Sequence, residues 1–224
     1  METLKSYNPA TEEILGEVEI TPAEEVPNIV ARAKAAQLAW GDLGLEGRAE
    51  LLKATADIFV DRVQEHGELM TKEMGKPLKE AIGEAKSLGW GIEEELAEII
   101  EALTPEVVED GRLRSTIYHD PLGVVGAITP WNFPNAMIAR KVAPALAVGC
   151  TFVAKPAAET PLSALAMAIL AERAGVPAGV FSVVTSNHSA EIGQEFTSNP
   201  KVRKLTFTGS TQVGRILLRQ GADQ

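Results

Sequence analysis

The second half of the chain alternates short runs of β-branched and aromatic residues with segments of helical pattern, and this alternation restricts the fold more than any other feature. Between two of these runs, Thr160 can cap a helix, Pro161 suits its first position and Gly175 ends it. Such alternation predicts an α/β fold with an open, parallel, Rossmann-like sheet covered on both faces. The strand-like runs are GVVGAI (123–128), TFVAK (151–155), GVFSVVT (179–185) and RKLTFTG (203–209).

The first part of the sequence has a different pattern, because residues up to about Leu103 place apolar side chains at near-helical spacing. We therefore expect an amino-terminal strand and helical region in residues 1–111 and an α/β portion in residues 112–224. One acidic cluster in the helical region is predicted to be a solvated helix face, namely Glu93, Glu94, Glu95, Glu98 and Glu101.

Composition excludes several classes of function. The formal net charge is -10, and no basic run offers a footprint for a phosphate backbone, so nucleic acid is not an expected partner. No apolar run is long enough to span a membrane, and the first residues lack the pattern of a secretory signal. The single Cys fits a reducing compartment, and we expect a cytoplasmic protein.

Polar residues that could carry chemistry follow the predicted strands, and ligands of open α/β sheets bind beyond the carboxyl ends of the strands. The stretch ITPWNFP (128–134) follows the first run, and Pro130 and Pro134 bracket it as a rigid loop. Asn132 in this loop is a candidate amide donor to a developing oxyanion. The commoner use of Asn in loops is an Asx turn, and this alternative stays open.

Two other strand ends are informative. Lys155 ends the second run, so its ammonium group either emerges at the sheet edge as a binding group or is an ordinary solvated lysine. The stretch FTGSTQVGR places Gly209 and Gly214 around a predicted helix start, whose amides can hold phosphate, although a tight turn has the same pattern. The stretch is no P-loop, and G-x-G-x-x-G is absent from the sequence. Arg140, in the helix predicted after the loop, can face either a substrate carboxylate or solvent.

Cysteine and histidine offer no clear catalytic pair. Cys150 is the one thiol, and its apolar neighbours predict a buried, structural side chain. His66, His119 and His188 lie far apart and lack metal-ligand spacing, so no metal site is expected.

Several segments, taken in order, resemble the aldehyde dehydrogenase superfamily over essentially the whole sequence. They are NPATEEILGEV (8–18), TKEMGKP (71–77), PLGVVGAITPWNFP (121–134), GCTFVAKPAAETPLSALA (149–166) and FTGSTQVG (207–214). The resemblance implies that Asn132 donates to the oxyanion of the thiohemiacetal and that Lys155 binds the adenine-side ribose. It also implies further residues beside the cofactor, namely Ile128, Thr129, Trp131, Gly209 and Ser210.

Within this superfamily, the stretch AMIARKVAPALAVGCTFVAKP (136–156) looks most like succinate-semialdehyde dehydrogenases. In those enzymes an Arg at the place of Arg140 contacts the substrate carboxylate, so the resemblance implies a short semialdehyde acid as substrate. Lactaldehyde-type members are similar here too and remain the alternative.

The resemblance also bears on the choice of cofactor. Many members that prefer NAD carry a Glu three residues after the lysine, whereas this chain has Ala158 there. Without that carboxylate a 2'-phosphate is not repelled, and Lys155 can attract it, so NADP is the expected cofactor and NAD the alternative. The neighbouring Glu159 tempers this preference.

The chemistry of the superfamily needs a nucleophilic Cys in a segment like N-x-G-Q-x-C and a basic Glu in a segment like E-L-G-G. Neither segment occurs in the 224 residues, so we expect the cofactor-binding half, with the catalytic domain absent and no activity alone. A non-catalytic nucleotide-binding or assembly module is the alternative. The resemblance further implies an oligomerisation hairpin near residues 112–122, an unpaired sheet edge and a homo-oligomer.

Overall fold

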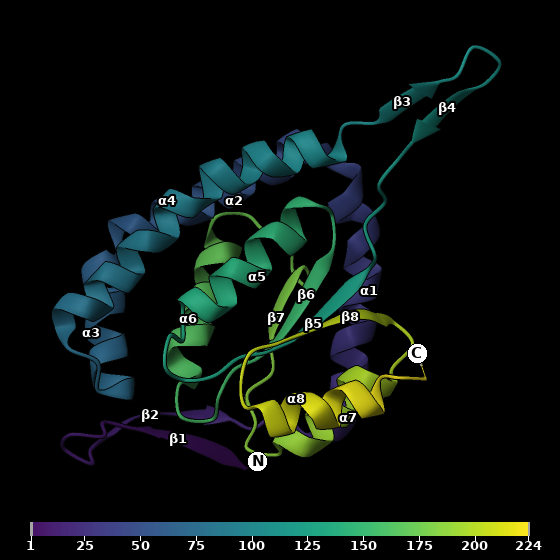
Figure 1. The fold of residues 1–224 in the computed structure, drawn as a ribbon. Coiled ribbons are helices and arrows are strands. Elements are labelled where there is room, and N and C mark those ends of the chain that lie inside the picture. The colour runs from purple at the N-terminus through teal and green to yellow at the C-terminus, as the bar shows by residue number, and fades with distance from the viewer. Residues whose placement is uncertain (1, 224) are drawn as a thin grey trace.

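A parallel four-stranded sheet forms the centre of the computed structural model, which describes residues 2–223 and, for residues 89–95, the backbone alone (Figure 1). The order of its strands is β7-β6-β5-β8, and all neighbouring pairs are parallel. The predicted open α/β sheet is therefore confirmed, strand by strand. The strands are β5 (Val124–Ile128), β6 (Thr151–Lys155), β7 (Phe181–Val183) and β8 (Val202–Phe207).

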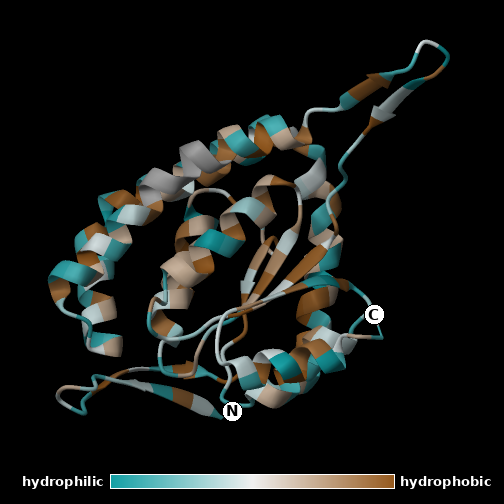
Figure 2. Cartoon of the chain, viewed as in Figure 1, coloured by the Kyte–Doolittle hydropathy of each residue, from teal (hydrophilic) through white to brown (hydrophobic). Residues whose placement is uncertain are grey.

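The two central strands, β5 and β6, are buried on both faces, and successive residues of a strand point to opposite faces. In β6, Phe152 and Ala154 join one hydrophobic cluster, whereas Val153 joins the other. Figure 2 shows the hydrophobic residues concentrated on these central strands. The first cluster packs under α5 (Ala136–Ala147) and α6 (Pro161–Arg173), and the second under α1 (Val26–Asp42) and α7 (Ser189–Ser198).

The amino-terminal region builds an outer layer over α5 and α6 (Figure 1). It also contributes α1, which packs against β5 and β6, and Trp40 Nε1 at the end of α1 donates to the carbonyl oxygen of Leu146 in α5 at 2.9 Å. The region predicted as residues 1–111 thus shares one core with the strands that follow it. Its other elements are β1 (Thr3–Tyr7), β2 (Ile14–Glu19), the 3-10 helix η1 (Ala23–Glu25), α2 (Gly44–Asp61), α3 (Val63–Met74) and α4 (Leu78–Leu103).

The side chains of Glu93, Glu94 and Glu95 lie outside the described residues, whereas Glu98 and Glu101 are exposed as expected. Among the described residues, no helix combines the length and the apolar character needed to cross a membrane.

An antiparallel hairpin projects from the body of the molecule (Figure 1). It pairs β3 (Glu106–Glu109) with β4 (Arg114–Ile117), so it begins before the predicted range of 112–122. At its turn, Asp110 Oδ1 accepts hydrogen bonds from the amides of Arg112 and Leu113, and Gly111 has a φ of 82°. The sequence interpretation missed β3 because this short run directly follows a long helical pattern.

The amino end of α6 corrects a second prediction. Thr160 occupies the N-cap position, but its side chain makes no capping hydrogen bond. Glu73 from α3 takes that role instead, accepting from the amides of Leu162 and Ser163 at 2.7 and 2.9 Å. Burial raises the pKa of the Glu73 carboxyl, and hydrogen bonds from Ser163, Leu162 and Ser6 oppose this shift. The helix is therefore capped across the layer, from outside its own sequence.

The final helix, α8 (Thr211–Gln220), follows β8 and packs against α7. Among the described strands, β8 pairs on one side alone, with β5, so it forms an edge of the sheet, as predicted. Val213, Ile216 and Leu218 of α8 are exposed.

Candidate functional site

Three strand ends that carry predicted site residues lie side by side in the sheet, in the order β6-β5-β8. Ile128 at the end of β5 is in register with Lys155 on one side and Phe207 on the other. Beyond the strands, the amide of Thr129 donates to the carbonyl oxygen of Lys155 at 3.2 Å, and the amide of Thr208 donates to that of Ile128 at 3.1 Å. The candidate residues at these three strand ends thus gather along one edge, where ligands of open α/β sheets bind, whereas Arg140 lies on α5.

The loop between Pro130 and Pro134 leaves β5 at the centre of this edge. Trp131 and Phe133 are 50% and 45% exposed, and Asn132 is exposed as well. The side chains of the loop are therefore accessible to a ligand. The fixed φ of each proline restricts the backbone that carries them.

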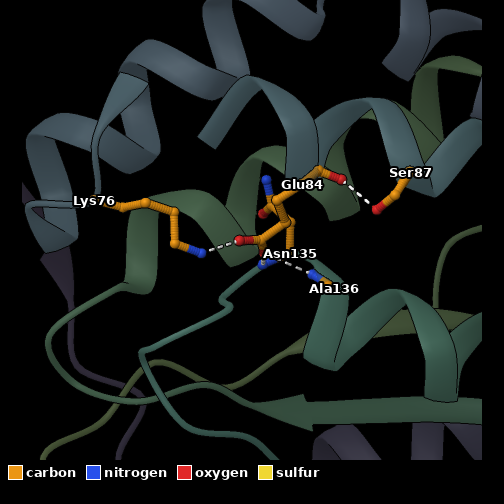
Figure 3. A network of polar contacts seen from close by, with 5 residues as sticks. All are labelled: Lys76, Glu84, Ser87, Asn135 and Ala136. Carbon is orange, nitrogen blue, oxygen red and sulfur yellow. Dashed lines mark hydrogen bonds and ion pairs between the residues drawn. The ribbon is translucent and has the colours of Figure 1, made fainter. Parts of the chain in front are cut away.

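The carboxyl end of the loop is anchored by a residue that the sequence interpretation missed (Figure 3). Glu84 of α4 accepts, through Oε1, from the amides of Asn135 and Ala136 at 3.2 and 3.0 Å. These amides open α5, and an Asp or Glu carboxylate at a helix amino terminus is stabilising there. The other carboxylate oxygen of Glu84 lies 2.5 Å from Lys76 Nζ, and both side chains are almost fully buried.

Lys76 also touches the loop directly. Its Nζ atom lies 3.6 Å from the centroid of the Phe133 ring, within the range of a cation–π contact. No local signal in the sequence marks this pair, because the Glu84 side chain meets amides 51 and 52 residues further along the chain.

Lys155 is buried, with 3% of its surface exposed, so the alternative of a solvated surface lysine is wrong. Its Nζ atom donates to Ser189 Oγ, at the start of α7, at 2.7 Å. Burial lowers the pKa of the Lys155 ammonium group, and the charge of Glu159 opposes this shift. Ala158, in the turn after β6, is partly buried.

The turn after β8 brings Gly209 and Ser210 to the same edge, where both are exposed. Ser210 is the N-cap of α8, and its Oγ accepts from the amide of Val213 at 3.3 Å. A Cβ atom at Gly209 would lie 2.5 Å from the Phe207 ring, so a side chain there would displace that ring. This close contact explains why residue 209 is a glycine even if no ligand binds there. It therefore agrees with the alternative that the glycine only permits a tight turn.

Arg140 and Lys141 are adjacent on α5, but their side chains contact different parts of the structure. Lys141 Nζ donates to Thr208 Oγ1 at 2.7 Å and ties α5 to the end of β8, a contact that the sequence interpretation missed. Burial lowers the pKa of the Lys141 ammonium group, and the nearby charge of Arg140 lowers it further. Arg140 is exposed and borders a largely apolar cavity of about 210 Å³ between α2, α4, α5 and α6.

Cys150 is buried and free, as predicted. Among the described residues, no group of three or more His, Cys, Asp or Glu side chains is arranged to hold a metal ion.

An open parallel sheet with its loops gathered at the carboxyl edge is an arrangement that nucleotide-binding α/β proteins use. The sequence pattern of the aldehyde dehydrogenase family matches residues 1–224. The chain belongs to the aldehyde dehydrogenase family.

Similar proteins cover nearly all of this chain. It is 49% identical over 225 residues to glutarate-semialdehyde dehydrogenase of Pseudomonas aeruginosa, covering 99% of this chain and 46% of that protein. It is 48% identical over 224 residues to the NADP(+) succinate-semialdehyde dehydrogenase of Escherichia coli, again covering 99% and 46%. The crystal structure of succinate-semialdehyde dehydrogenase from Burkholderia pseudomallei superposes with a TM-score of 0.94 at 46% identity, covering 99% of this chain and 46% of that one. The chain therefore spans about half the length of these relatives.

The burial of Lys155 predicts a pH dependence of stability. Because its folded pKa is lowered, the folded chain binds fewer protons than the unfolded chain between the two pKa values, and stability rises with pH through that window. A Met at this position does not titrate. We therefore expect Lys155→Met to be more favourable, relative to the parent chain, at about pH 7 than at about pH 9.5 in urea unfolding.

The matched control is Lys34→Met, since Lys34 is an exposed residue of α1. An equal difference for Lys155→Met at both pH values would contradict the lowered pKa.

Proposed function

We propose that this chain is the nucleotide-binding half of an NAD(P)-dependent oxidoreductase that converts a short semialdehyde acid to its carboxylate. The observation that carries the proposal is the buried Lys155 ammonium group at the sheet edge beside the Asn132 loop. A buried charge without a carboxylate partner costs stability, and such groups are concentrated at functional sites. Family membership supports the same assignment.

The hydrogen-bond donors of the Lys155 ammonium group are suited to binding a nucleotide. An ammonium group has three donors, and one of them is used on Ser189. No carboxylate of the described residues forms an ion pair with Lys155, so its remaining donors suit a ribose hydroxyl or a 2'-phosphate. We propose that Ile128, Thr129 and Trp131 line the same nucleotide, and that Gly209 and Ser210 face its pyrophosphate and nicotinamide side.

Bound NADP would accept a hydride from the substrate, while the residues of this chain would orient and polarise the reacting groups. We propose that the Asn132 amide donates to the oxygen on which negative charge develops. A donor held by a rigid loop is effective in this role because it needs little reorganisation during the reaction. The segments N-x-G-Q-x-C and E-L-G-G do not occur in the sequence, so the proposal gives this chain no nucleophile and no general base.

For the substrate, we propose a short aldehyde with an anionic end, such as succinate semialdehyde. The relatives named above act, by their names, on glutarate and succinate semialdehydes. The exposed guanidinium group of Arg140 can bind a carboxylate in a bidentate manner. A lactaldehyde-like aldehyde remains the alternative substrate.

The cofactor preference is tested by titrating the chain with NADPH and NADH in parallel while the quenching of tryptophan emission is followed. We expect saturable binding with NADPH the tighter. Ala158→Glu should shift the affinity ratio about tenfold or more towards NADH, because its carboxylate would repel a 2'-phosphate and accept from a 2'-hydroxyl.

The control Ala178→Glu adds the same charge at an exposed site that precedes β7, away from the carboxyl edge of the sheet, and should leave the ratio unchanged. An unchanged ratio of NADPH to NADH affinity in Ala158→Glu would show that residue 158 does not discriminate between a 2'-phosphate and a 2'-hydroxyl group on the ribose. Absence of binding by either nucleotide would contradict the proposed function itself.

A non-catalytic nucleotide-binding or assembly module is the second candidate, favoured by the hairpin of β3 and β4, where Val107, Val108 and Ile117 are exposed. Both candidates predict nucleotide binding, and aldehyde-dependent formation of NADPH separates them. Reproducible turnover by the purified chain would contradict its assignment as a binding half that is inactive alone.

We also propose that the hairpin of β3 and β4 joins copies of the chain in a homo-oligomer. Val107, Val108 and Ile117 are each more than two-fifths exposed, and Figure 2 shows hydrophobic residues along this projecting segment. Exposed apolar strands of this kind pair readily with another chain.

Val107→Thr together with Val108→Thr keeps the β-branched shape but removes apolar area, so the dissociation constant of the oligomer should rise about tenfold or more. A concentration series in sedimentation velocity measures this constant. Val60→Thr, at an exposed position of α2, is the control. Unchanged assembly in the double variant would exclude the hairpin as the interface.

A further inference from the structure

We propose that the buried Lys76–Glu84 pair is the positioning device of the Asn132 loop. Both residues lie outside the strand ends, on the corner between α3 and α4 and on α4 itself. The catalytic meaning of this inference rests on the proposed function, since it assumes that Asn132 is the oxyanion donor. The structural claim, that the pair holds the loop in position, rests only on contacts between described residues.

The pair contacts the loop at two points, and both lie on the carboxyl side of Asn132. Glu84 Oε1 accepts from the amides of Asn135 and Ala136 (Figure 3), and Lys76 Nζ lies against the Phe133 ring. Phe133 adjoins Asn132 in the sequence, so the ammonium group constrains the neighbouring backbone.

The loop's carbonyl groups bond to the first turn of α5, where the Phe133 oxygen accepts from the amide of Met137 at 2.9 Å, but its side chains leave the two amides that open the helix without a partner. Asn135 is the N-cap residue of α5, yet its side chain makes no capping hydrogen bond. Both polar atoms of that side chain are buried without a hydrogen-bond partner among the described residues. The two amides that open α5 are therefore satisfied by Glu84.

The charges of the pair depend on each other. The Lys76 and Glu84 side chains are 6% and 2% exposed, so removing either one leaves the other as an uncompensated buried charge. Breaking a buried pair is far more costly than replacing both members with neutral residues of similar shape. This property distinguishes electrostatic positioning from simple packing and makes the inference testable.

The experiment measures backbone hydrogen exchange of residues 130–137 in the chain without nucleotide. In Lys76→Met we expect exchange at Asn135 and Ala136 to accelerate about tenfold or more, because the buried Glu84 charge loses its partner and local opening to solvent becomes more favourable. Glu84→Gln should have a similar effect through the unpaired Lys76. The double variant, which keeps an amide oxygen as acceptor and leaves no charge, should exchange more slowly than either single variant.

Two further variants keep the inference open to contradiction if a single variant fails to fold. Phe133→Leu removes the ring beside Lys76 at a half-exposed site, and it should accelerate exchange in the loop without lowering the melting temperature. Lys79→Met and Glu80→Gln, which alter exposed residues of the first turn of α4, are controls and should change nothing.

Unchanged exchange at residues 130–137 in Lys76→Met and in Phe133→Leu would overturn the proposal. So would a double variant that exchanges faster than both single variants, or acceleration spread evenly over α4 and α5 with a lowered melting temperature, since these indicate packing alone. The readout needs no nucleotide, so a failure of nucleotide binding would overturn the proposed function and leave this inference intact.

Discussion

Two buried carboxylates from the helical layer, Glu73 and Glu84, accept hydrogen bonds from the amides that open the two helices on one face of the sheet. Glu73 serves α6 and Glu84 serves α5, and neither helix is capped by its own N-cap side chain. Burying a carboxylate is costly, but several hydrogen bonds and the positive end of a helix offset that cost. Since α5 and α6 follow the turns after β5 and β6, these two contacts also fix the turns that form the candidate site.

This arrangement explains why a long helical region accompanies a rather small sheet. The helices α3 and α4 cover α5 and α6, and they also supply the groups that hold the Asn132 loop in place. Rigid support for exposed polar side chains is what a catalytic donor needs. At Lys155, in contrast, stability and function conflict. Burial of its ammonium group without an ion pair to a described carboxylate is unfavourable for the fold, but it leaves donors available for an anionic or hydroxyl-rich ligand.

Much of the fold could be predicted from the sequence, because the information is local. Runs of β-branched residues, together with turn residues such as Gly175, located all four strands of the sheet and the helix after Thr160. The strand ends then indicated where site residues gather, and β5 does lie between β6 and β8.

What could not be predicted depends on partners distant in the sequence. Thr160 does not cap α6, because Glu73 reaches those amides from 89 and 90 residues away. The burial of Lys155 and the contact of Lys141 with Thr208 likewise require the assembled sheet.

The central claim is that the carboxyl edge of β6, β5 and β8 holds a nicotinamide nucleotide. Hydrogen exchange of the chain with and without saturating NADPH tests it most directly, since a bound ligand slows local opening wherever it makes contact. The account predicts protection at residues 128–134, 155–159, 186–191 and 208–214, with the hairpin of residues 106–117 unaffected. Unchanged exchange in all of these segments, or protection confined to residues around the cavity beside Arg140, would contradict it.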